Sequence, residues 1–113
     1  MKNRDKELEL EVLKTFKENP NLTQRQVAKE LNLSLGKTHY LIKGLIEKGW
    51  VKLENFKKSD NKKRYSYLLT WSGMAQKTKL TWDFLKRKEK EYEELKAEID
   101  NLKLEVDKEE EML

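Results

Sequence analysis

Residues 23–70 read TQRQVAKELNLSLGKTHYLIKGLIEKGWVKLENFKKSDNKKRYSYLLT, and this stretch decides the fold. Its apolar residues first recur at helical spacing over two short segments and then alternate over two shorter ones. A lysine-rich turn separates the two alternating segments. Two short helices followed by a β-hairpin are the element order of a winged helix-turn-helix, in which one helix enters the DNA major groove and the hairpin lies beside it.

Capping residues predict where these elements begin and end. Thr23 has Gln26 three residues later, which is the spacing of a capping box at the start of the first short helix. Ser34 is a natural N-cap of the second short helix. Gly49 stands where a left-handed residue commonly ends a helix, and Thr70 is the predicted cap of a helix that follows the hairpin.

Apolar spacing predicts a further helix and a buried face. The apolar residues between Leu8 and Phe16 fit one face of a helix of about four turns, which ends before Pro20. In the helix after Ser34, apolar residues recur at helical spacing on one side, so that side is expected to be buried. These residues are Leu41, Leu45 and Ile46, with Thr38 on the same side.

The C-terminal part is expected to be one long helix. Residues 71–108 contain no proline and only Gly73 as a weak helix breaker. We therefore predict a mainly α fold with a small β-hairpin wing. A winged helix-turn-helix domain over residues 1–70 is followed by a long C-terminal coiled-coil helix over residues 71–113.

A heptad repeat in this tail predicts a homodimer. β-Branched Ile99 and Val106 fall at a positions, with leucine at d positions, a choice that favours a parallel two-stranded coiled coil. Glu91 and Glu98 would then face Lys96 and Lys103 of the partner, whereas an antiparallel pair would oppose like charges. The alternative is a helix that packs on its own domain. The predicted dimerisation residues are Leu85, Tyr92, Leu95, Ile99, Leu102 and Val106.

Charge is distributed unevenly over the 113 residues, which carry a net charge of +4. Residues 1–79 hold 18 Lys/Arg and 9 Asp/Glu, whereas residues 80–113 hold 7 and 12. A basic front and an acidic rear predict a polyanion-binding domain on a stalk that does not bind. The alternative is that both parts are ordinary solvated surfaces.

The exposed side of the second short helix is the predicted contact with double-stranded DNA. Lys37 and Lys43 can reach phosphates or a guanine edge, and Tyr40 can contact a phosphate or a thymine methyl group. Gly36 lets the backbone approach a phosphate, and the N–H groups of the helix start attract phosphate. The alternative is a plain solvated helix face. The predicted contact residues are Ser34, Gly36, Lys37, Thr38, His39, Tyr40 and Lys43.

The tip of the hairpin adds a second predicted contact, because five of the eight residues 57–64 are basic. Such a wing follows the phosphate backbone or enters a minor groove, where arginine is favoured, so Arg64 is the predicted minor-groove residue. The alternative is a flexible, soluble loop. The predicted contact residues of the wing are Lys57, Lys58, Lys62, Lys63 and Arg64.

Other classes of function find no support in the sequence. His39 is the only histidine and there is no cysteine, so no metal or other cofactor is expected. No nucleophile motif or phosphate-binding loop indicates an enzyme. Without an apolar run of about 18 residues or a secretory signal, we expect no membrane contact and a cytoplasmic location. The three tryptophans are expected to pack in a core where the hairpin meets the tail, rather than to line an aromatic pocket.

The sequence also resembles a known family. Residues 22–31 and 45–51 look like the winged-helix core of the MarR family. Residues 34–40, SLGKTHY, together with residues 54–62 and the Glu/Lys-rich tail, are similar to a narrower group. That group is the small MarR-like regulators associated with exopolysaccharide biosynthesis loci in bacteria. The resemblance covers nearly the whole chain.

This resemblance implies a bacterial, dimeric transcription regulator that binds pseudo-palindromic operators with one helix of each subunit in a major groove. Larger MarR members build the dimer from helices at both chain ends and often hold a phenolic ligand there. This chain is shorter and its last helix looks like a coiled coil, so no ligand residue is carried over and a small-molecule effector stays unknown. The alternative is a winged-helix adaptor whose basic face binds an acidic protein and whose coiled coil drives assembly.

Overall fold

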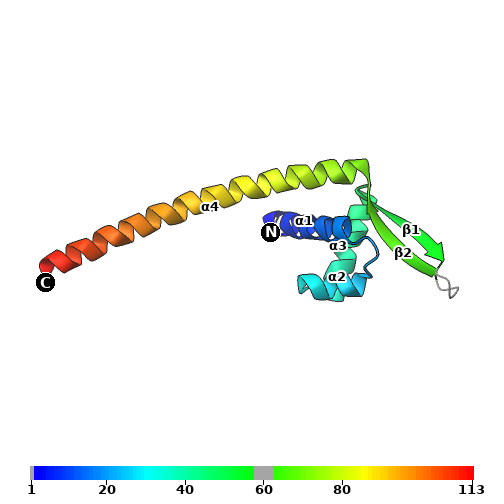
Figure 1. Ribbon diagram of the computed structural model, residues 1–113, viewed down its shortest axis with the longest axis horizontal. Coiled ribbons are helices and arrows are strands. Elements are labelled where there is room, and N and C mark those ends of the chain that lie inside the picture. Colours follow the sequence, from blue (N-terminus) through cyan, green and yellow to red (C-terminus); the bar gives the residue numbers. More distant parts are fainter. Residues whose placement is uncertain (1, 58–62) are drawn as a thin grey trace. The chain divides into compact units, whose positions relative to one another are not determined.

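The computed structural model of the protein describes residues 2–57 and 63–113 (Figure 1). The described part is mainly helical with one antiparallel hairpin, so the predicted winged helix-turn-helix followed by a long helix is confirmed. It divides into two compact units, Met1–Thr81 and Trp82–Leu113. The elements in chain order are α1 (Lys2–Glu18), α2 (Gln24–Leu31), α3 (Leu35–Glu47), β1 (Val51–Lys57), β2 (Lys63–Leu69) and α4 (Trp71–Met112).

The predicted N-caps are present. The hydroxyl of Thr23 accepts a hydrogen bond from the backbone N–H of Gln26, whose side chain accepts one in turn from the Thr23 N–H at 2.8 Å. Ser34 caps α3 by accepting a backbone N–H at 3.0 Å, and Thr70 caps α4 in the same way at 3.0 Å. Each cap satisfies N–H groups that a helix start leaves without partners.

Left-handed residues end α2 and α3. Gly49 has φ +77°, and the following N–H, of Trp50, donates to the carbonyl of Leu45 at 3.0 Å, which is a Schellman ending. Asn32, with φ 55°, ends α2 in the same manner. Asparagine is one of the few residues other than glycine that visits this region routinely. The tight turn that follows Asn32 brings α3 directly after α2.

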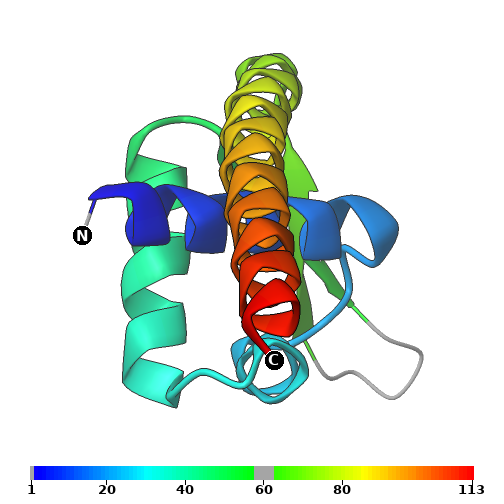
Figure 2. The ribbon, with the colours of Figure 1, turned by 90° about the vertical axis from the view of Figure 1, so that its left-hand side faces the viewer.

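The core of the first unit is built around α1, which supplies its largest fully buried side chains, among them Leu10, Leu13 and Phe16. The ring of Phe16 stacks on Tyr67 of β2, with ring centroids 4.7 Å apart. Figure 2 shows α1 crossing α3, which contributes Ile42 and other apolar residues to the same core. α1 ends before Pro20, as predicted, but it is longer than about four turns, because it begins six residues before Leu8, at Lys2.

The buried face of α3 differs in one residue from the predicted one. Leu41 and Leu45 are buried, as expected, whereas Ile46 is 37% exposed. Ile42 is fully buried in its place. A helix turns by about 100° per residue, so residues 38, 41, 42 and 45 form a narrower stripe than one that includes 46.

The hairpin pairs β1 with β2 in a register that runs from Val51 opposite Leu69 to Lys57 opposite Lys63. Val51 and Tyr67 are buried against the helices, since alternate residues of a strand point to one face. The backbone N–H of Tyr67 also donates to the carbonyl of Pro20 at 2.9 Å. The hairpin is therefore fixed to the helical core at the end nearer to α3 and α4.

The start of α4 belongs to the first unit. Gly73 is buried, and a Cβ placed there would overlap the backbone carbonyl oxygen of Trp50. Leu80 is also buried, so the first unit extends to Thr81, beyond the predicted boundary after residue 70. The prediction that the tryptophans pack in a core is wrong for two of them, because Trp71 is 88% and Trp82 is 59% exposed.

The second unit consists of the remainder of α4. Its apolar heptad residues are exposed to between 43% and 63%, with Ile99 the most covered and Tyr92 the least. A single helix cannot bury its own apolar stripe.

Candidate nucleic-acid interface

The exposed side of α3 follows from its buried side. Thr38, Leu41, Ile42 and Leu45 face the core, so the residues between them point outward. Gly36, Tyr40 and Lys43 are exposed, with Tyr40 at 63%. A Cβ at Gly36 would meet no atom within 4 Å, which leaves open space over the first turn.

Thr38 does not belong to this surface, and its prediction as a contact residue is wrong. Its side chain is fully buried, and its hydroxyl donates to the backbone carbonyl of Ser34 at 2.9 Å. Threonine commonly makes this bond to the preceding turn of a helix. The hydroxyl is satisfied inside the fold, so it cannot reach a duplex.

Lys37 lies at the edge of the exposed side and has partners within the chain. Its ammonium nitrogen lies 3.0 Å from Oδ1 of Asp5 on α1, and 5.1 Å from the ring centroid of Tyr40. The side chain is 36% exposed. Sequence reasoning placed Lys37 on the exposed side, where the structure shows it partly exposed, but nothing in the sequence indicates that Asp5 lies beside it, 32 residues away.

His39 is exposed and tied to α2. Its Nδ1 lies 3.1 Å from Oε1 of Gln24, and the amide nitrogen of Gln24 donates to the hydroxyl of Tyr67 at 3.1 Å. Gln24 therefore connects α3 with strand β2. This residue was missed by sequence reasoning, because its partners lie 15 and 43 residues away and no local pattern signals them.

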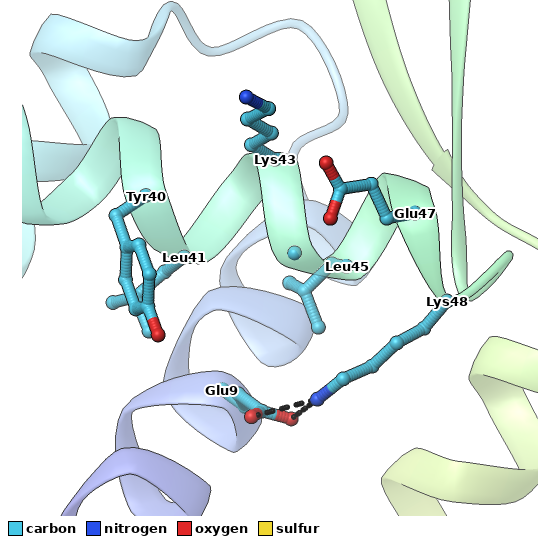
Figure 3. A pocket seen from close by; sticks show the side chains of 8 residues that line it. Glu9, Tyr40, Leu41, Lys43, Leu45, Glu47 and Lys48 are labelled. Carbon is cyan, nitrogen blue, oxygen red and sulfur yellow. Dashed lines mark hydrogen bonds and ion pairs between the residues drawn. The ribbon is translucent and has the colours of Figure 1, made fainter.

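A groove of about 450 Å³ runs along α3 beside α1 (Figure 3). Lys48 reaches across it to Glu9, with the ammonium nitrogen 3.0 and 3.1 Å from the two carboxylate oxygens. Lys43, by contrast, forms no ion pair with any residue that the structure describes. Among the described residues, nothing therefore competes with a phosphate or a base edge for the Lys43 ammonium. The lining residues are Glu9, Tyr40, Leu41, Lys43, Gly44, Leu45, Glu47 and Lys48.

The wing residues fall largely outside the described part of the chain. Lys58 and Lys62 lie in the stretch 58–62, which is not described. The backbone places Lys57 opposite Lys63, and Arg64 opposite Phe56, at the far end of the hairpin ladder. The side chains of these residues are not described, so their contacts with DNA stay a prediction.

Across residues 2–57 and 63–113, no helix combines the length and apolarity needed to cross a membrane. No group of three or more histidine, cysteine, aspartate or glutamate side chains gathers within that same part in a way that would hold a metal ion.

One family model is similar to the part of the chain that contains this surface. Residues 5–52 match the family described as winged helix-turn-helix DNA-binding. The matched residues span α1, α2, α3 and the first residues of β1, and thus the whole exposed side of α3. The match covers fewer than half of the 113 residues and shows a similarity to that family. A search of the curated proteins finds no match.

Several solved structures have the same fold. The MarR/EmrR family transcriptional regulator from Acinetobacter sp. ADP1 superposes with a TM-score of 0.58 at 18% identity, over 89% of this chain and 75% of that one. The Staphylococcus aureus MepR–DNA complex superposes with a TM-score of 0.56 at 22% identity, over 86% of this chain and 73% of that one. S. aureus MarR in complex with salicylate and kanamycin superposes with a TM-score of 0.54 at 17% identity, over 72% of this chain and 53% of that one. This chain therefore spans about half the length of that MarR protein. These likenesses show that the chain shares the winged helix-turn-helix fold of these structures.

Proposed function

We propose that this winged-helix protein is a bacterial, sequence-specific transcription regulator of the MarR type. The observation that carries the proposal is the outward side of α3, where Tyr40 is 63% exposed and Lys43 is free of ion pairs among the described residues. A helix that follows a tight helix-helix turn and presents such side chains is suited to the major groove. MepR, which has this fold, has been solved bound to DNA.

The regulator acts as a homodimer through α4. The heptad residues from Leu85 to Val106 are exposed on a helix that has no apolar partner in its own unit. A second copy is the occupant proposed, because a parallel pair sets Glu91 against Lys96 and Glu98 against Lys103. Two copies of α3 related by a two-fold axis would read the two halves of a pseudo-palindromic operator.

The targets proposed are exopolysaccharide biosynthesis genes. This part rests on the resemblance of residues 34–40, residues 54–62 and the tail to the small MarR-like regulators of such loci. The protein would meet its operator in the cytoplasm. The residues of the wing, from Lys57 to Arg64, would add phosphate or minor-groove contacts beside each half-site.

A selection of fragmented genomic DNA on the purified full-length chain tests this function. At about 150 mM salt, nonspecific phosphate binding is weakened and specific sites are retained. We expect sequencing to recover a few fragments that share an inverted repeat. Fragments without a common motif would contradict sequence-specific regulation and favour an adaptor whose basic face binds an acidic protein.

Tyr40→Ala tests the role of α3 in the same assay. The variant is expected to lose about 1–3 kcal/mol of binding to the selected site, the usual size of one base contact, and much less on a random duplex of equal length. Fluorescence anisotropy with both duplexes measures the two affinities. An equal loss on the two duplexes would show that Tyr40 contacts only the backbone.

A further inference from the structure

Asp5 brings a negative charge to the edge of the proposed DNA-binding surface. Its carboxylate oxygen lies 3.0 Å from the ammonium nitrogen of Lys37, and the side chains of Lys37 and Asp5 are 36% and 47% exposed. The same ammonium lies over the ring of Tyr40, 5.1 Å from its centroid. Asp5, Lys37 and Tyr40 thus form one cluster, in which α1 contributes the acid and α3 the other two residues.

This cluster is expected to contribute little to the stability of the fold. Ion pairs as exposed as this one contribute little to folding, since water already solvates both charges. A cation 5.1 Å from the centroid of an exposed ring adds a modest further attraction. The arrangement does, however, fix where the Lys37 ammonium lies when no DNA is bound.

The position of that ammonium matters for nonspecific binding. Affinity for any duplex comes mostly from lysines and arginines that neutralise phosphates and so release counterions. A lysine whose charge is already balanced by Asp5 contributes less to this counterion release.

We propose that Asp5 is a specificity-determining residue of the regulator. It holds the Lys37 ammonium beside Tyr40 and withholds it from the phosphates of unrelated DNA, which lowers nonspecific affinity. On the operator, the same pair keeps Tyr40 in position to contact the base edges. This inference rests on the proposed function, and it adds a residue of α1 to a surface otherwise built from α3 and the wing.

The test replaces the carboxylate by its neutral amide, Asp5→Asn, in the full-length chain. Glu11→Gln is the matched control, because Glu11 is an exposed acid on the same helix that forms no ion pair with the described residues. Both variants change the net charge equally. Binding is measured on a random duplex and on the selected operator over a range of salt concentrations.

We expect Asp5→Asn to steepen the salt dependence on random DNA by about 0.9 log units per log unit of salt for each bound subunit, the value of one added phosphate contact. Random-duplex affinity should rise several-fold per subunit at about 0.15 M salt, and operator affinity should rise less. Glu11→Gln should raise both affinities alike with little change in slope. Equal slopes for the two variants would overturn the proposal.

Repeating Asp5→Asn in a chain that already carries Lys37→Ala separates the effect of the ion pair from any other effect of Asp5. In Lys37→Ala, Asp5→Asn should no longer change the slope, whereas a change that persists there would also overturn the proposal. The urea unfolding midpoints of Asp5→Asn, Glu11→Gln, Lys37→Ala and the double variant are expected to agree. If Asp5 only stabilised the fold, the midpoint of Asp5→Asn would fall below that of Glu11→Gln. The salt slopes on random DNA can be measured whether or not an operator exists, so they test the role of Asp5 alone. A failure of sequence-specific regulation would instead appear with the wild-type protein, as a selection that recovers no common motif.

Discussion

At Gly73, the backbone of α4 approaches the backbone of Trp50 so closely that no side chain fits between them. The carbonyl of Trp50 is also held by a hydrogen bond from the N–H of Thr70, at 3.0 Å, so neither segment is free to move away. Gly73→Ala is therefore expected to lower the free energy of unfolding by about 1–3 kcal/mol, as overpacking of a tight site does. Urea unfolding measures this loss.

Gly44→Ala is the control for that substitution. Gly44 lies in the interior of α3 and a Cβ there would meet nothing within 4 Å. Stability is expected to hold or to rise by up to about 1 kcal/mol, because alanine favours a helix over glycine. Equal losses in the two variants would show that the close approach at Gly73 is not the cause.

Residues that act locally were predictable from the sequence, and those that act across the fold were not. Thr23, Ser34 and Thr70 cap helices through backbone N–H groups three residues away, so spacing alone identifies them. Gly73 serves a contact with Trp50, and its sequence neighbours show only a mild helix breaker. Thr38 looked like a contact residue because it lies near the helix start, but packing against other elements buries it.

At the scale of the element, α3 depends on its first turn. Ser34 supplies the side-chain acceptor for the N–H of Lys37 at 3.0 Å, which fixes the turn that also carries Gly36. Ser34→Ala is expected to destabilise the domain by about 1 kcal/mol, the usual cost of losing an N-cap. Thermal or urea unfolding without DNA measures this effect.

Ser34→Asp separates the cap from the contact with DNA. Aspartate caps a helix about as well as serine, and its charge is favourable at a helix start, so stability should be kept. Its carboxylate would repel phosphates at the same place, so binding to every duplex should weaken. An aspartate variant that binds DNA as tightly as the wild type would place Ser34 outside the interface.

The same contrast between local and distant causes applies to α4. Its helical state from residue 71 onward was predictable, because the sequence lacks proline and repeats apolar residues at helical spacing. The exposure of Trp71 and Trp82 was not, since their size and apolar character favour burial. Whether such a residue is buried depends on what lies beside the helix, and sequence periodicity does not specify that.

At the scale of the whole molecule, the tail is expected to decide whether the protein binds a full operator or a half-site. Ile99→Asp puts a charge at an a position of the proposed seam, where a buried unpaired carboxylate is costly. We expect a monomer by sedimentation, with weaker binding limited to a half-site. Ala97→Asp, two residues away on the outer side of the heptad, should stay dimeric. A dimer that survives Ile99→Asp would refute the heptad assignment.

The uneven charge of the chain has a measurable consequence of its own. If the basic front binds phosphates and the acidic tail does not, the salt dependence of binding should respond to lysines of the wing and not to lysines of α4. Lys62→Ala with Lys63→Ala is expected to weaken binding to all duplexes and to reduce the salt slope by about 1.8 per bound subunit, or about 0.9 for each phosphate that a lysine no longer neutralises.

Lys86→Ala with Lys90→Ala removes the same charge from outer positions of the tail helix and should leave the slope unchanged. Titrations of both double variants between about 50 and 200 mM salt compare them directly. A slope that falls equally in the two would mean that net charge, rather than the wing, sets the affinity for DNA.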